Sequence, residues 1–259
     1  MPTLEDIKAQ IKLLYSFPST REQALELEKS LGATLNIGSI QAELELEKFI
    51  TADPAMLALK RDVQKLVNLD DPVLIMGESG TGKSIIAKAL HGSRRGKFVH
   101  VNCTSMPDEL IESELFGHKK GSFTGAIADR IGKFQEASGG TIFLDEIGDM
   151  PMNMQTKLLL AIEEKWVCLV GDNTPIPINC RIVSATNQDV QAKIRNDLYW
   201  RLGVFELWIS PLRERLQDAA LICRQLDPNF VLQGSDLRLE GNVRELQRAV
   251  KRWKTLSVK

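Results

Sequence analysis

Gly77-Glu78-Ser79-Gly80-Thr81-Gly82-Lys83-Ser84 is the most informative motif in this sequence. It fits the pattern G-x-x-x-x-G-K-[ST], which describes a loop whose backbone wraps around phosphate groups. The apolar run Pro72-Val73-Leu74-Ile75-Met76 before it predicts a buried parallel strand, and residues 85–90 after it have helical apolar spacing. Because the motif requires this strand–loop–helix context, we interpret it as a phosphate-binding loop rather than a glycine-rich turn with an exposed lysine.

The chemistry of such a loop comes from its backbone and its last two residues. Its glycines let backbone N–H groups point inward, and the amino end of the following helix adds partial positive charge. Lys83 is expected to reach the terminal phosphates of a nucleotide, and Ser84 is expected to hold Mg²⁺. The sequence therefore predicts that the protein binds a nucleoside triphosphate.

The composition is that of a globular protein without strong net charge. The chain has 259 residues, of which 43% are hydrophobic and 26% are charged, and its formal net charge is −1. This excludes a global basic field that would attract nucleic acid. Four cysteines without a C-x-x-C pair and three histidines argue against a zinc site or a disulfide framework. No apolar run reaches membrane-spanning length and no signal peptide is evident, so we expect a soluble, cytoplasmic protein without a membrane partner.

Three domains are expected: a helical extension at residues 1–47, an α/β core at 48–210 and a small helical subdomain at 211–259. In the extension, apolar spacing predicts helices over about residues 4–15, 21–31 and 40–49. Thr20 with Gln23 resembles a capping box before the second helix, and Gly32 is expected to end that helix. The extension either docks on the core, a neighbouring subunit or a partner, or only stabilises the chain.

From Thr51 onward, strand and helix patterns alternate. Strands are predicted at residues 73–76, 97–102, 141–146, 181–185 and 204–209. Helices are predicted at residues 54–67, 154–163, 214–226 and 243–256. Alternation of this kind predicts a parallel sheet between two layers of helices, which binds ligands at the carboxyl ends of its strands.

Four polar residues stand where predicted strands end. Asp145 and Glu146 follow a buried apolar run, so Asp145 is a candidate to hold Mg²⁺ through water and Glu146 to polarise the attacking water. Asn102 and Asn187 end the strands expected on either side, where a neutral amide can bond a water, a phosphate or a carboxylate. The alternatives are an ordinary acidic loop start for the carboxylates and helix capping for the amides.

Two other features of the sequence indicate contacts with other protein chains. Arg195 and Arg201 are candidates for guanidinium groups donated across a subunit interface to a transferring phosphoryl group, with surface salt bridging as the alternative. In the glycine-rich stretch 114–126, Phe116 and Phe123 are expected to face outward as a movable protein contact. A buried turn with core aromatics is the alternative there.

Residues 114–126 resemble the signature E-L-F-G-H-x-x-G-A-F-T-G-A of bacterial enhancer-binding proteins, the AAA+ ATPases that activate sigma-54 RNA polymerase. Within the hexapeptide, Ser122 in place of alanine is the only difference. The resemblance extends from about Phe49 through Leu246. It includes the phosphate loop and the motifs V-N-C at 101–103, G-G-T-I-F-L-D-E-I-G-D-M-P at 139–151, A-T-N at 185–187, D-L-Y-W-R-L at 197–202, P-L-R-E-R at 211–215 and G-N-V-R-E-L at 241–246.

The resemblance implies an AAA+ P-loop fold that binds ATP with Mg²⁺ and hydrolyses ATP. The implied nucleotide-binding residues are Gly77, Glu78, Ser79, Gly80, Thr81, Gly82, Lys83, Ser84, Asp145 and Arg244, with Ser84 and Asp145 at the metal ion. The implied catalytic residues are Asn102, a switch that restrains Glu146; Glu146 itself; Asn187, or sensor I; and the trans-acting arginines Arg195 and Arg201. Arg244 corresponds to sensor II.

The resemblance also implies a protein partner, the sigma-54 RNA polymerase holoenzyme. The implied contact is the loop Gly121, Ser122, Phe123, Thr124, Gly125 and Ala126, led by Phe123 and Thr124. A hairpin over residues 166–180 is expected to work beside this loop. A hexameric ring of identical chains is expected. Because the sequence stops at Lys259, directly after the lid, we expect no sequence-specific DNA binding by this chain.

Three features depart from the family pattern. The run between A-T-N and the arginine-bearing helix lacks the family's Gly-x-Phe, the lid between Pro211 and Gly241 is short, and Glu240-Gly241 replaces Trp-Pro-Gly. The main hypothesis is an ATP-hydrolysing ring that remodels sigma-54 holoenzyme. One alternative is a regulatory homologue that binds sigma-54 or related rings without productive turnover. Another is an ATPase that acts on a different protein client.

Overall fold

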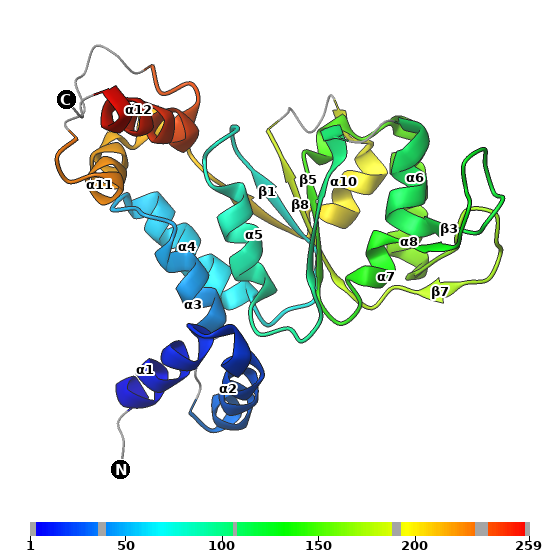
Figure 1. The fold of residues 1–259 in the computed structure, drawn as a ribbon, viewed down its shortest axis with the longest axis horizontal. Helices are drawn as coiled ribbons and strands as arrows, with labels where there is room; N and C mark the ends of the chain where they lie inside the picture. The colour runs from blue at the N-terminus through cyan, green and yellow to red at the C-terminus, as the bar shows by residue number, and fades with distance from the viewer. Residues whose placement is uncertain (1–3, 36–39, 106–107, 188–192, 231–237, 257–259) are drawn as a thin grey trace. The chain divides into compact units, whose positions relative to one another are not determined.

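The computed structural model describes residues 4–35, 40–105, 108–187, 193–230 and 238–256. The chain divides into two compact units (Figure 1). The first unit contains residues 1–68, 76–93 and 208–259, and the second contains residues 69–75 and 94–207. No described helix is long and apolar enough to cross a membrane.

The second unit is built on a five-stranded sheet whose order is β2-β5-β8-β1-β9. Its strands are β1 (Val73–Met76), β2 (Phe98–Asn102), β5 (Thr141–Asp145), β8 (Arg181–Thr186) and β9 (Phe205–Trp208). β2 pairs with β5 in parallel, and β5 pairs with β8 in parallel. Every residue of β5 and β8 is buried, as a strand covered on both faces requires. The predicted α/β fold with a parallel sheet is therefore confirmed.

Short elements complete this unit. They are η2 (Cys103–Ser105), α6 (Asp108–Phe116), α7 (Lys133–Glu136), η3 (Ile147–Asp149), α8 (Met152–Glu164) and α10 (Asn196–Leu202). Two antiparallel pairs lie outside the main sheet: β3 (Gly117–His118) with β4 (Arg130–Ile131), and β6 (Trp166–Val167) with β7 (Ile176–Pro177). The second pair lies within the hairpin expected at residues 166–180.

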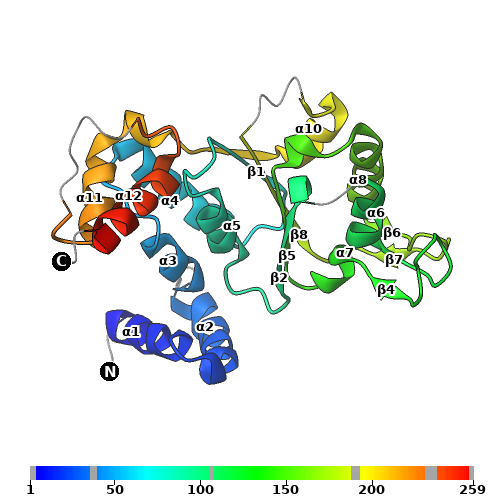
Figure 2. The ribbon, with the colours of Figure 1, turned by 45° about the horizontal axis from the view of Figure 1, so that its top comes forward.

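The first unit is helical. Its elements are α1 (Leu4–Tyr15), η1 (Pro18–Thr20), α2 (Arg21–Leu35), α3 (Ile40–Glu47), α4 (Pro54–Leu66), α5 (Lys83–His91), η4 (Leu212–Glu214), α11 (Leu216–Leu226) and α12 (Asn242–Leu256). α4 starts at Pro54, and the Asp53 carboxylate before it accepts from the amides of Ala55 (3.0 Å) and Met56 (3.1 Å). We call the segment containing η4, α11 and α12 the lid; its two long helices lie side by side in Figures 1 and 2.

The N-terminal helices have a small core of their own and one buried carboxylate. Ile11, Ala24 and Ile40 are fully buried together, which joins α1, α2 and α3. Beside them the Glu28 side chain accepts three hydrogen bonds, from Tyr15 Oη (2.6 Å), the Ile40 amide (2.7 Å) and Ser93 Oγ (2.7 Å). Because Ser93 follows the helix that starts in the phosphate loop, Glu28 ties the extension to that helix.

Two details at the ends of α2 deserve comparison with the sequence. The expectation that Gly32 ends the helix is wrong, because α2 continues to Leu35. A glycine can lie inside a helix when the rest of the helix packs well, since its cost there is only about 1 kcal/mol. Thr20 directly precedes the helix, and its hydroxyl donates to the carbonyl oxygens of Leu14 (2.6 Å) and Phe17 (3.1 Å).

Replacing Glu28 with alanine is expected to lower the free energy of unfolding by about 2 kcal/mol, because one buried and two partly buried donors lose their acceptor. Urea unfolding measures this change, and hydrogen exchange should rise first in α1 and α2. Glu26→Ala, an exposed position on the same helix, is the matched control and should change neither measurement. Equal stability of the two variants would contradict the role of Glu28.

Candidate functional site

The phosphate loop lies between β1 and α5. Gly80 and Gly82 have φ of 82° and 112°, a region that side-chain-bearing residues rarely adopt. A Cβ at Gly80 would also lie 2.6 Å from the Gly241 carbonyl oxygen. The Lys83 ammonium group folds back on the loop, donating to the carbonyl oxygens of Gly77 (2.8 Å) and Glu78 (3.3 Å). The loop therefore has the backbone shape of a phosphate cradle, with its lysine buried against it.

Three side chains of the lid form hydrogen bonds with the phosphate loop. Both terminal nitrogens of Arg213 donate to the Glu78 carboxylate, at 2.6 and 2.8 Å, and this ion pair lowers the pKa of Glu78. The side-chain amide of Asn242 donates to the Glu78 carboxylate and to the Ser79 carbonyl oxygen, both at 3.1 Å. Arg244, the residue implied as sensor II, donates to Ser79 Oγ at 2.8 Å. Lid and loop are thus one hydrogen-bonded assembly.

A buried ion pair supports the assembly from below. Arg215 Nη1 lies 3.2 Å from Asp218 Oδ2, and the two side chains are 1% and 0% exposed. Arg215 Nη2 also donates to the Thr81 carbonyl oxygen in the phosphate loop at 3.2 Å. Asp218 accepts from Thr51 Oγ1 (2.6 Å) and from the Ala52 amide (2.7 Å) at the approach to α4. Burial is the main reason that the pKa of Arg215 is lowered.

The carboxylates lie at the carboxyl end of β5. The parallel register places Asn102 of β2 opposite Asp145, as the expected strand order required. Glu146, just past the strand, has φ of 54° and ψ of 49°, a left-handed conformation uncommon for a residue with a side chain. Its Oε2 accepts from the backbone N–H of Asn187 at 3.1 Å. Strain of this kind tends to occur at functional sites.

The Asn102 side chain contacts Thr104 in this arrangement. Its Oδ1 accepts from the amide of Thr104 (3.0 Å) and from Thr104 Oγ1 (2.7 Å), so it caps the turn that leads into α6. Capping was the alternative to a switch role, and the geometry is compatible with both. The switch role of Asn102 and the sensor role of Asn187 stay predictions.

The surroundings of Asp145 suit a cation. Its Oδ1 is buried and has no hydrogen-bond partner among the residues that the structure describes. Burial and the negative charges of Asp145, Asp149 and Glu146 raise the pKa of the Cys103 thiol to about 12. No group of three or more metal-ligating side chains occurs in the described residues. A single carboxylate such as that of Asp145 suits Mg²⁺, which commonly binds through one or two protein oxygens together with phosphates and water.

The two candidate trans-acting arginines carry surface ion pairs. Arg195 forms a two-pronged contact with Asp197, with nitrogen–oxygen distances of 2.7 and 3.1 Å. Arg201 Nε donates to Glu163 Oε1 at 3.0 Å. Both pairs are exposed to water, which screens their attraction, so either arginine can leave its partner at little cost. Their action across an interface stays a prediction.

The glycine-rich loop ends in an exposed tip. Phe123 is 37% exposed, and its ring lies edge-on to the buried His118 with 5.0 Å between centroids. Thr124 beside it is exposed, and Gly121 and Gly125 have nothing within 4 Å of a built Cβ. The expectation that Phe116 also faces outward is wrong. Phe116 is 5% exposed and stacks on Phe134, because it ends α6 and packs against α7.

Comparison with known proteins agrees with this arrangement. The family model described as the sigma-54 interaction domain matches residues 49–208. The response regulator protein PilR of Pseudomonas aeruginosa is 45% identical over 232 residues, which cover 81% of this chain and 52% of PilR. The regulatory protein AtoC of Escherichia coli is 36% identical over 96% of this chain and 57% of its own length. The chain belongs to the sigma-54 interaction domain family.

Solved structures extend the comparison to the fold. NtrX from Brucella abortus, solved in complex with ATP, has a TM-score of 0.72 and 25% identity, and the match covers 90% of this chain and 60% of that one. RuvB of Thermotoga maritima, at 17% identity and a TM-score of 0.55, shares the fold; the match covers 82% of this chain and 64% of that one. This likeness confirms the AAA+ fold class. The chain spans about half the length of the curated relatives that it matches.

In this family member the hairpin of β6 and β7 lies against the base of the Phe123 loop. The Lys119 amide donates to the Val170 carbonyl oxygen at 3.0 Å, and the Val170 amide donates to the Gly117 carbonyl oxygen at 2.9 Å. A Cβ at Gly171 would lie 2.6 Å from the Ser122 Cβ, so the Gly171 backbone packs directly against the Ser122 side chain. The sequence expectation that the hairpin lies beside this loop is confirmed.

Sequence reasoning missed several residues that the structure places in the site. Arg213, Arg215 and Asn242 lie in motifs quoted for the resemblance, which was the available signal, and Asp218 had none. Gln155, in α8, was also missed. It is fully buried, donates to the carbonyl oxygens of Met150 and Lys193 (both 2.9 Å), and accepts from the Arg195 amide (2.9 Å). One amide side chain thus joins the turn after Glu146 to the start of α10.

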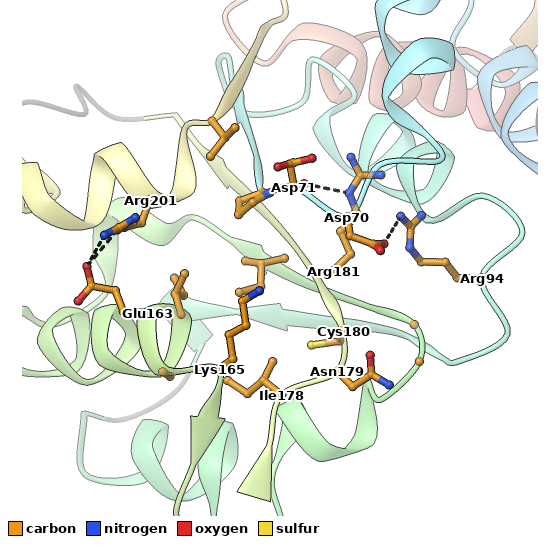
Figure 3. Close-up of a pocket in the computed structure, with 17 residues that line it drawn as sticks. Asp70, Asp71, Arg94, Glu163, Lys165, Ile178, Asn179, Cys180, Arg181 and Arg201 are labelled. Carbon is orange, nitrogen blue, oxygen red and sulfur yellow. Dashed lines mark hydrogen bonds and ion pairs between the residues drawn. The ribbon is translucent and has the colours of Figure 1, made fainter.

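A separate pocket of about 710 Å³ lies at the opposite edge of the sheet. Its lining includes Pro72, Gly140, Arg181 and Val204, which stand at or just before the amino ends of β1, β5, β8 and β9. Arg181 and Cys180 are among the lining residues labelled in Figure 3. Burial lowers the pKa of Arg181 to about 10. Arg201 also lines this pocket, bonded to Glu163. Because the predicted phosphate and carboxylate groups follow the carboxyl ends of strands, the pocket is not the candidate nucleotide site.

Replacing Asp218 with alanine is expected to destabilise the first unit by about 3–5 kcal/mol, because the Arg215 cation stays buried without its partner. Urea unfolding measures the loss. Gln217→Ala, an exposed neighbour on α11, is the control and should leave stability unchanged. If the Asp218 variant unfolded at the same urea concentration as the control, the buried pair would not support the phosphate loop.

Proposed function

We propose that this chain is an ATP-hydrolysing AAA+ protein that works as a hexameric ring in the cytoplasm and remodels sigma-54 RNA polymerase holoenzyme. The observation that carries the proposal is that one chain combines a shaped phosphate loop, a carboxylate pair at the end of β5 and an exposed Phe123 tip. Membership of the sigma-54 interaction domain family supports the choice of partner. NtrX, a related structure, was solved with ATP and with ADP, which supports the choice of nucleotide.

The proposed domain roles follow the sequence: residues 1–47 form an extension, 48–210 the ATPase core and 211–259 the lid. Lys83 and the backbone amides of the phosphate loop bind the terminal phosphates. Ser84 and Asp145 hold Mg²⁺, which would neutralise phosphate charge when bound. Glu146, with one oxygen anchored by the backbone N–H of Asn187, orients the attacking water. Arg244 of the lid reports on the nucleotide from its place on Ser79.

The route from the carboxylates to the loop runs through the sheet. Asn102 lies opposite Asp145 on the neighbouring strand, and η2 and α6 follow Asn102 in the chain. α6 ends at Phe116, next to the strand that begins the Phe123 loop. A change at Glu146 that releases or recruits Asn102 would therefore shift α6 and tilt the loop as a unit. This is how hydrolysis would move Phe123 and Thr124 against sigma-54.

ATPase activity measured against protein concentration, beside particle size, tests the proposal. A ring whose sites are completed by neighbouring subunits should show specific activity that rises steeply as the chain assembles. Activity absent at every concentration would support the regulatory homologue without turnover and contradict the proposal. Hydrolysis without any binding of sigma-54, even with a transition-state analogue bound, would leave the ATPase and remove this client.

Replacing Thr124 with alanine separates hydrolysis from client binding. ATPase activity should stay within about twofold of wild type, because Thr124 is exposed and outside the nucleotide site. Binding to sigma-54, followed by size exclusion with the analogue present, should be lost. Thr255→Ala in α12 is the control and should bind normally. Retained binding by the Thr124 variant would show that the loop is not the contact.

Mixing two inactive variants tests the trans action of Arg201. Lys83→Ala should remove phosphate binding in its own subunit, and Arg201→Ala should remove the guanidinium that the neighbour needs, so each alone should lose at least about 100-fold in activity. Mixed rings should regain activity, because a Lys83-variant subunit can donate Arg201 to an intact phosphate loop. Arg224→Ala, an exposed arginine of α11, should stay active. An active Arg201 variant would favour the salt-bridge alternative.

A further inference from the structure

His100 stands on the same face of the sheet as the candidate cation ligand. Residues alternate faces along a strand, so Phe98, His100 and Asn102 of β2 share one face. The register sets His100 opposite Phe143 and Asn102 opposite Asp145 on β5. The His100 ring stacks on the buried Phe143 ring, with 5.0 Å between centroids and an angle of 27°. The strand pairing thus directs an imidazole along the face that carries Asp145.

The ring contacts the carboxylate directly. His100 Nε2 lies 3.2 Å from Asp145 Oδ2. A carboxylate only accepts hydrogen bonds, so the proton in this bond is carried by His100 Nε2. The His100 side chain is 46% exposed, whereas that of Asp145 is 13% exposed. The stack on Phe143 therefore holds the ring in place, and the hydrogen bond fixes the carboxylate.

The hydrogen bond from His100 to Asp145 Oδ2 also determines the direction of the other carboxylate oxygen, Oδ1. Asp145 Oδ1 is buried and has no hydrogen-bond partner among the described residues. The terminal torsion of an aspartate is broad, so a carboxylate with no bond on either oxygen would sample many orientations. A donor on Oδ2 selects one orientation and leaves Oδ1 available in a fixed direction. Outer partners orient metal-ligating groups in this way.

We propose that His100 is a positioning residue that orients the Asp145 carboxylate for its cation and so sets the Mg²⁺ requirement of nucleotide binding. The inference rests on the proposed function, in which Asp145 holds Mg²⁺ for ATP. His100 touches neither the nucleotide nor the reacting atoms in this role. It acts by restricting the orientations of the Asp145 carboxylate. Loss of His100 therefore weakens cation binding and leaves the phosphate loop intact.

Fluorescent ADP titrated at increasing MgCl₂, without turnover, tests the inference in the full chain. His100→Ala should raise the Mg²⁺ concentration for half-maximal binding by about tenfold, the low end of the range for outer partners of metal ligands. Affinity for ADP in EDTA should be unchanged. His100→Asn, which keeps an N–H donor, should recover most of the Mg²⁺ response. Lys97→Ala, an exposed residue just before β2, is the matched control.

Asp145→Ala separates the two hypotheses. If it abolishes the Mg²⁺ response while His100→Ala behaves as wild type, Asp145 is the ligand and the role of His100 is overturned. If Asp145→Ala leaves the Mg²⁺ response intact, the cation assignment in the proposed function fails. A fall in EDTA affinity for His100→Ala that His100→Asn does not rescue would also overturn the inference, because it would indicate general damage to the fold.

Discussion

The parallel register of β2, β5 and β8 places the polar groups of the candidate site at one edge of the sheet, and the rest of the second unit is built around this register. It sets Asn102 opposite Asp145 and Leu144 opposite Ser184, so the groups that follow these strands share one edge of the sheet. A slip by one residue would turn Asp145 to the other face. Because every residue of β5 and β8 is buried, such a slip would exchange the packing of both strands, and burial therefore holds the register.

The other unit depends on a different kind of contact. Its phosphate loop is held by charged and amide side chains that come from the lid, with Arg215 and Asp218 buried beneath them. Such pairs cost desolvation, and their value lies in the hydrogen bonds that they complete. The Arg215 guanidinium donates a hydrogen bond to the Thr81 carbonyl oxygen, and Arg213 neutralises the charge of the Glu78 carboxylate. The shape of the loop and the position of the lid are thus set together.

Most of the elements, and the motifs of the site, could be predicted from the sequence because the signals are local. The phosphate loop needs its glycines, and apolar runs such as residues 142–144 are typical of strands that are covered on both faces. Phe116 was placed wrongly, because the glycines beside it indicate a loop while its partner Phe134 lies 18 positions later in the chain. Gln155 could not be predicted, because a glutamine is common in helices. Its role depends on three hydrogen bonds to backbone groups that only the folded structure brings to it.

Sequence patterns were enough to predict the fold class, the polar residues that follow the strands at the candidate site, and the family. Tertiary structure alone decided that Glu28 ties the extension to α5, that Asp218 supports the phosphate loop and that His100 contacts Asp145. The physical reason is range. Periodicity and turn chemistry act between neighbours in the chain, whereas a buried carboxylate or a hydrogen bond across strands is satisfied by groups that only folding brings together.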